Sequence, residues 1–221
     1  AEIIIGFCMA LDLSTTAAIV AGHFATAHEM LGRNRDVNHL KLGELNEEFF
    51  QRHLRSAMPD ETLKVKEIIG LDNNESGSSL ITEMTSRKLK KTIGLFPFHV
   101  FYATEKGDES QLIMTKVKPT SHEVVGALNQ LASMCGAELA AEFDKYKYEV
   151  GLAGTDRREL AVFRQTDERF TRHTPKLFGI YEDAERESYV IVQEFLTDME
   201  LMDSANDVSR WTDVHIRAAL Q

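Results

Sequence analysis

The sequence predicts an α+β fold with an antiparallel sheet and flanking helices, and two observations carry that prediction. Helical and extended patterns come in separate blocks: two helices, three or four strands, two helices, two strands and a last helix. The composition is that of a soluble globular protein, with 43% apolar and 27% charged residues among 221. That length suffices for one large domain or two small ones.

The first two elements are helices. Residues 14–31 form an alanine-rich segment with high helix propensity, which Ser14 can cap and Gly32 can end. After a polar connector, a second helix begins near Asn46 and ends before Pro59. Its apolar face consists of Phe49, Phe50 and Leu54.

Strands follow from Glu61 onward, where the spacing of the apolar residues becomes extended. Residues 72–79 are rich in turn formers and separate this first extended stretch from an antiparallel meander. The hairpin turn of that meander is expected at Lys106-Gly107-Asp108. Its strands are predicted at 80–89, 96–105 and 110–118.

The second half of the chain adds helices and a strand pair. A helix is expected at 156–169, where Asp156 can cap the first turn. The apolar strand at 188–196 is expected to lead out of the sheet along an edge. The other elements are a helical tract at 121–147, a loop at 151–155, a strand at 176–182 and a helix at 207–219.

Charge and cysteine content exclude several classes of protein. A net charge of −10 argues against a nucleic-acid binder that uses a broad basic face. Cys8 and Cys135 are far apart and lack the spacing of a disulfide framework or a zinc site, so we expect a reducing, cytoplasmic location. The apolar residues 1–9 lack a basic flank and are followed by Asp12, so no signal peptide or membrane span is expected.

One lysine lies in the middle of an apolar strand. Residues alternate between the two faces of a strand, so Lys116 shares its face with Met114 and Lys118. An ammonium group between apolar flanks needs a carboxylate or phosphate partner if it is buried. The alternatives are that Lys116 extends to water from an edge strand, or that Lys118 is the functional lysine. Pro119 ends the strand just beyond Lys118, so Lys116 is held more firmly.

Glu159 is the acid that could pair with this lysine. It lies near the start of a short amphipathic helix, followed by Leu160 and Phe163. Its alternative role is that of an acid in the first turn, which the helix dipole favours. Together with Lys116, however, Glu159 would form a pair of a strand lysine and a helix glutamate. Protein kinases use such a pair at their phosphate-binding site.

A glycine with flanking hydroxyl residues could approach a phosphate. Ser76, Gly77 and Ser78 lie between two predicted strands, where backbone N–H groups could contact an anion. An ordinary turn is the alternative. The chain contains neither a G-x-x-x-x-G-K-[ST] nor a G-x-G-x-x-G motif, so a P-loop and a Rossmann fingerprint are both excluded.

These residues resemble the N-terminal lobe of the aminoglycoside phosphotransferase and choline kinase superfamily, particularly its choline/ecdysteroid-kinase-like branch. The likeness covers roughly residues 45–200. Its strand lysine stands three residues before a proline, which selects Lys116 over Lys118. The other matching segments are Leu45 to Phe50, Gly77 to Ser79, Glu159 to Phe163, Pro175 to Gly179 and Val190 to Leu196.

The resemblance implies a fold, a cofactor and roles for these residues. The fold is a protein-kinase-like N-lobe at 59–200, preceded by an N-terminal helical segment at 1–58 and followed at 201–221 by the start of a connection to an absent C-lobe. Lys116 would bind the α- and β-phosphates of ATP, and Glu159 would orient it. Ser76, Gly77 and Ser78 would belong to the nucleotide loop. The adenine would be bound by the backbone of Gln193, Glu194, Phe195 and Leu196.

The chain departs from the family in its catalytic residues. The family's H-x-D catalytic loop and its Mg²⁺-binding Asp belong to a second lobe, and no H-x-D occurs here. We therefore expect the ATP-binding lobe of a small-molecule kinase that phosphorylates a hydroxyl acceptor, with the catalytic residues and Mg²⁺ ligands outside this chain. The alternative is a non-catalytic interaction module, which could form homo-oligomers through its alanine-rich N-terminal helices.

Overall fold

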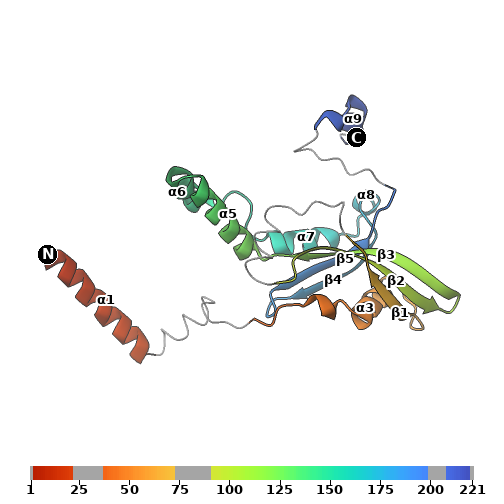
Figure 1. Ribbon diagram of the computed structural model, residues 1–221, viewed down its shortest axis with the longest axis horizontal. Coiled ribbons are helices and arrows are strands. Elements are labelled where there is room, and N and C mark those ends of the chain that lie inside the picture. Colours follow the sequence, from red (N-terminus) through yellow and green to blue (C-terminus); the bar gives the residue numbers. More distant parts are fainter. Residues whose placement is uncertain (1, 22–36, 73–90, 199–207, 220–221) are drawn as a thin grey trace. The chain divides into compact units, whose positions relative to one another are not determined.

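The computed structural model describes residues 2–21, 37–72, 91–198 and 208–219. Within them the fold is α+β, and its centre is a five-stranded antiparallel sheet in the order β1-β2-β3-β5-β4 (Figure 1). The predicted strand at 80–89 lies outside the described residues. The strands are β1 (Lys64–Gly70), β2 (Gly94–Thr104), β3 (Gly107–Lys118), β4 (Leu177–Asp183) and β5 (Ser188–Glu194).

Helices α3 (Glu47–Ala57) and α7 (Thr155–Phe163) cover opposite faces of the sheet (Figure 1). The alternation along β5 demonstrates this, because Val190 and Val192 share a core with α3. Ile191, which lies between them, packs with Leu160 of α7 in a second, smaller core. Side chains that are fully buried on both faces explain why β5 has an uninterrupted apolar sequence.

Strand β5 is an interior strand, so its predicted position at the edge of the sheet is wrong. It pairs with β3 on one side and with β4 on the other. In the described sheet, β1 and β4 are the outer strands. The β2–β3 hairpin is present as predicted, and Gly107 adopts φ +126°, a value that favours glycine over other residues.

The second predicted helix is confirmed as α3. The Asn46 side chain accepts a hydrogen bond from Phe49 N over 3.1 Å and caps the helix. Phe50 and Leu54 are fully buried in the larger core. The chain divides into two compact units, Ala1–His39 with Glu185–Glu187 and Leu40–Ala184 with Ser188–Gln221. Helix α3, assigned from sequence to the N-terminal segment 1–58, therefore shares its unit and its core with the sheet.

Two predicted helical tracts are interrupted. The tract at 121–147 is two helices, α5 (Ser121–Cys135) and α6 (Ala137–Tyr146), because Gly136 between them adopts φ 150°. The helix predicted at 156–169 is α7 followed by the single turn α8 (Glu168–Thr171). The last described helix, α9, spans Asp213–Ala219 and follows a 3₁₀ turn at Val208–Arg210.

Helix α1 spans Glu2–Val20, so the predicted start of the first helix at Ser14 is wrong. The part of the predicted 14–31 helix beyond residue 21 lies outside the described residues. None of the residues of α1 is buried. Among the described helices, α1 alone is long and apolar enough to cross a membrane, a test that a signal sequence near an N-terminus also passes. The expected absence of a membrane span and the proposed self-association of the N-terminal helices both stay predictions.

A buried histidine on α3 packs against the sheet. His53 is 7% exposed, and its ring lies with its centroid 4.6 Å from that of Phe49. Gly179 of β4 makes this possible, because any Cβ at that position would overlap the His53 ring. No described residue bonds to His53 Nε2. Burial, with a smaller contribution from the charge of Arg52, lowers the pKa of His53 to about 4.

We expect this histidine to make the fold sensitive to acid. In the unfolded chain His53 takes up a proton near its ordinary pKa of about 6.5, whereas the folded protein keeps it neutral down to about 4. The contribution of His53 to the free energy of unfolding is therefore fully present above pH 6.5. It is lost as the pH falls from 6.5 to 4, by up to about 3 kcal/mol. Urea unfolding of the wild type and of His53→Leu across this range tests it. Equal acid dependence in both proteins would contradict the assignment.

Candidate functional site

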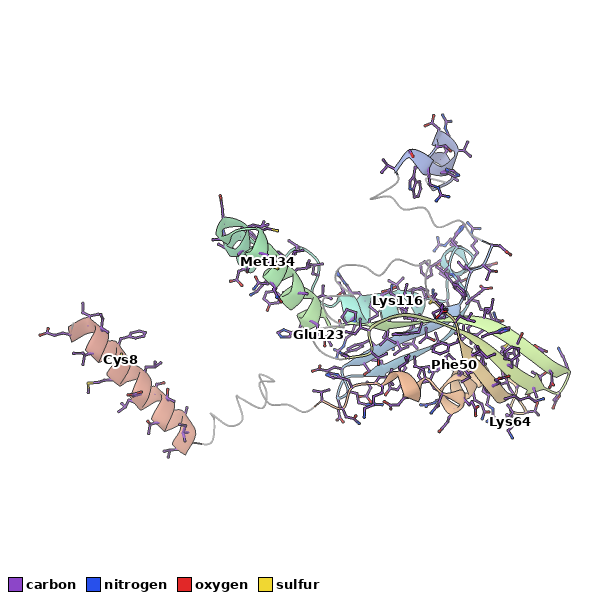
Figure 2. All side chains as sticks on the ribbon, in the orientation of Figure 1. Cys8, Phe50, Lys64, Lys116, Glu123 and Met134 are labelled. Atoms are coloured by element: carbon purple, nitrogen blue, oxygen red, sulfur yellow. The ribbon has the colours of Figure 1, made fainter. Side chains whose placement is uncertain are left out.

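The site lies on the face of the sheet that α7 covers, at the C-terminal end of β3. Met114, Lys116 and Lys118 project towards α7, whereas Ile113 and Val117 lie in the larger core with α3. Figure 2 shows Lys116 on the α7 side of the sheet and Phe50 of α3 on the other side. The shared face of Lys116 and Lys118 is as the alternation along the strand predicts.

The two lysines share a single carboxylate on α7. Lys116 Nζ lies 2.6 Å from Glu159 Oε1, and Lys118 Nζ donates to Glu159 Oε2. The predicted pairing of Lys116 with Glu159 is therefore present, and Lys118 is a second partner that the sequence did not reveal. The side chain of Lys116 is 38% exposed and that of Glu159 is 29% exposed, whereas that of Lys118 is only 10% exposed.

The charges at the site leave a positive excess. Two ammonium groups against one carboxylate amount to one net positive charge. Burial alone would raise the pKa of Glu159, but hydrogen bonds from Lys116 and Lys118 outweigh that effect and leave its pKa below the ordinary value. Glu159 is thus ionised at neutral pH. Because Lys116 is partly exposed, a positive excess of this kind can attract an anion from solution.

Helix α7 is fixed in place by contacts on both sides of Glu159. Leu160 is fully buried against β5. Asp156 is 6% exposed, and its Oδ2 accepts a hydrogen bond from Ser121 N over 3.0 Å. Gly154, and not Asp156, is the N-cap residue of α7. Asp156 Oδ1 nevertheless accepts a hydrogen bond from Arg157 N over 2.9 Å in the first turn of that helix, while its Oδ2 binds the first residue of α5. The N-terminal ends of α5 and α7 are held together.

The start of α5 is held to the sheet by a buried ion pair. Lys91, just before β2, places its Nζ 3.0 Å from Glu123 Oε1. The two side chains are 1% and 10% exposed. Glu123 Oε2 also accepts from Thr120 N over 2.7 Å and completes a capping box at the start of α5. The sequence S/T-x-x-E could have revealed the capping box, but not its lysine partner 32 residues upstream.

The predicted adenine-binding backbone lies at the end of β5, beside the lysine strand. Gln193 is opposite Met114 on β3, two positions before Lys116. Glu194 N donates to Lys176 O over 2.8 Å, and Phe195 N donates to Leu112 O over 3.1 Å. These two N–H groups are therefore already used within the protein.

Leu196 supplies a further donor of the predicted segment. Its side chain is partly exposed, and no described residue accepts a hydrogen bond from its backbone N–H. Among Glu194, Phe195 and Leu196, the backbone N–H of Leu196 is therefore the one without an acceptor in the described part of the chain.

Two predictions about the site lie beyond what the described residues can test. The Ser76, Gly77 and Ser78 loop falls outside them. Within the described residues, no group of three or more His, Cys, Asp or Glu side chains could hold a metal ion. The Mg²⁺ ligands, expected from the resemblance to lie outside this chain, stay a prediction.

Comparisons with known proteins add no assignment. Neither a protein-family model, nor a curated protein, nor a solved structure matches the chain. The case for a function therefore rests on the geometry of the site.

Proposed function

We propose that this chain is the ATP-binding lobe of a small-molecule kinase, with Lys116 contacting the nucleotide phosphates. The observation that carries the proposal is the Lys116–Glu159 ion pair between β3 and α7. In protein kinases the phosphate-binding lysine lies on the third strand and pairs with a glutamate of the helix that follows, and the active site requires that pair. The strand order β1-β2-β3-β5-β4, with α7 between β3 and β4 in sequence, is compatible with such a lobe.

The register of the sheet supports Lys116 rather than Lys118 as the ligand-facing lysine. The segment Glu194–Leu196 follows the Gln193–Met114 pair directly. At about 3.3 Å per residue, Lys116 is about 7 Å along β3 from that pair, and Lys118 is about 13 Å from it. Lys116 is also the more exposed of the two. A nucleotide whose adenine contacts the segment after Gln193 would therefore reach Lys116 before Lys118.

The acceptor in this proposal is a small hydroxyl compound, as in the family that the sequence resembles. A phosphoryl transfer also needs an aspartate near the acceptor hydroxyl and ligands for Mg²⁺. We propose that another lobe contributes them, so the 221-residue chain binds nucleotide without transferring phosphate.

Isothermal titration of the 221-residue chain with ATP tests the proposal. We expect saturable binding of one ATP per chain, weakened by salt because the contact is largely electrostatic. Adenosine, which lacks phosphates, should bind much more weakly. A chain that is folded by circular dichroism and binds neither ATP nor ADP would overturn the proposed function.

A further inference from the structure

We propose that Lys118 is the positioning residue of this site: it holds the Glu159 carboxylate, so that Lys116 can present its ammonium group to the phosphates of a nucleotide. The inference rests on the proposed function and deepens it. It gives a role to the second lysine, which the kinase-type pair of one lysine and one glutamate does not require.

The difference in burial between the two lysines separates their roles. Lys118 is enclosed, with 10% of its side chain exposed, and it lies opposite Tyr189 in the β3–β5 ladder. A buried ammonium group is costly unless it is paired, so Lys118 and Glu159 stabilise each other wherever Lys116 points. Lys116, with 38% of its side chain exposed, can contact a ligand from its present position.

The hydrogen-bonding capacity of the groups is consistent with this division. A carboxylate has two oxygens, and here each accepts from a different lysine. A lysine ammonium group has three N–H donors, and Glu159 Oε1 is the partner that the described residues supply to Lys116. Two donors are left for phosphate oxygens, so Lys116 need not leave Glu159 when a nucleotide binds.

The positions of both partners are fixed by the surrounding structure. Glu159 is next to Leu160, which is fully buried, on a helix that Asp156 ties to α5. Lys118 is the last residue of β3 and is still paired with β5. The carboxylate therefore has one rigidly placed partner and one accessible partner.

A double-mutant cycle on ATP affinity tests the role of Lys118. If Lys118 acts through Glu159, Lys118→Met weakens ATP binding about 5- to 10-fold, the effect of losing one ordinary hydrogen bond. Lys118→Arg restores most of the affinity because it still pairs with the carboxylate. In the Glu159→Gln background, Lys118→Met should have no further effect. If Lys118 itself contacted the phosphates, the two substitutions would weaken binding additively, and the inference would be overturned.

The cycle remains decisive if Lys118→Met alone fails to fold. Glu159→Gln with Lys118→Met leaves no unpaired charge from this pair, so the comparison of that double variant with Glu159→Gln still separates the two outcomes.

A second measurement distinguishes failure of this inference from failure of the proposed function. In the ligand-free chain, ¹³C NMR of the Glu159 carboxyl group reports its titration. We expect the midpoint to rise further in Lys118→Met than in Lys116→Met, and the reverse order would overturn the role of Lys118. A wild-type chain that binds no ATP, yet shows the expected order of midpoints, would overturn the nucleotide function and leave Lys118 as the residue that holds Glu159.

Discussion

Lys116→Met is expected to weaken ATP binding by about 10- to 100-fold, because a charged hydrogen bond contributes about 1.5–3 kcal/mol. Methionine keeps the length of the side chain and its apolar contacts but removes the ammonium group. The Glu159 carboxylate keeps Lys118 as a partner, so the fold should survive the substitution. Calorimetric titration of the variant with ATP measures the effect.

Lys66→Met is the matched control for this prediction. Lys66 is also a strand lysine in an ion pair, with Asp108 at 2.6 Å, and both side chains are at least half exposed. Asp108 lies eight residues along β3 from Lys116, about 26 Å away at 3.3 Å per residue. ATP affinity should be the same in Lys66→Met as in the wild type. Equal losses in the two variants would mean that ATP binds through general attraction to cations rather than at the Lys116 site.

Lys91→Met is expected to destabilise the fold by about 3–5 kcal/mol, because it leaves the Glu123 carboxylate buried without its cation. The Lys91 and Glu123 side chains are nearly inaccessible, so water cannot replace the lost partner. Glu123 also caps α5, so the loss should affect the helix start as well as the sheet. Denaturant unfolding monitored by circular dichroism gives the free energy of unfolding.

Two comparisons isolate the cause of that loss. Adding Glu123→Gln to Lys91→Met removes the unpaired charge and should recover a large part of the stability. The exposed pair of Lys66 and Asp108 provides the reference, and Lys66→Met should cost at most about 1 kcal/mol. If Lys91→Met destabilises the protein no more than Lys66→Met, the buried pair does not have the role assigned to it.

Local signals in the sequence were sufficient for several elements. Asn46 and the spacing of Phe49, Phe50 and Leu54 predict α3, because a capping side chain and an apolar face act within a few residues. The β2–β3 hairpin follows from Gly107 in the same way.

Where several local signals compete, the prediction fails. Ser14 has the chemistry of an N-cap, but no proline lies between Ile3 and Ser14 and the single glycine there, Gly6, is tolerated, so α1 continues through Ser14. The prediction of one helical tract at 121–147 fails in the opposite way, since a single glycine within a helical pattern does not reveal that the φ of Gly136 is positive.

Long-range features of the fold could not be predicted from the sequence. The position of β5 inside the sheet depends on which strand pairs with which, and β4 takes the edge. Similarly, the alternation along β3 predicts that Lys116 and Lys118 share a face, but not that one carboxylate on α7 binds both. That contact depends on how α7 packs, which Leu160 and the Asp156–Ser121 contact determine.

The most direct test of the central claim is covalent labelling with an acyl-phosphate derivative of ATP. A lysine amine beside the bound phosphates that reaches the acyl carbon attacks it, forms an amide and releases ATP. Tandem mass spectrometry then identifies the acylated lysine. We predict that Lys116 is the principal site and that excess ATP prevents its labelling. Labelling that falls mainly on Lys118 or Lys66, or that excess ATP does not reduce, would contradict a nucleotide site at Lys116.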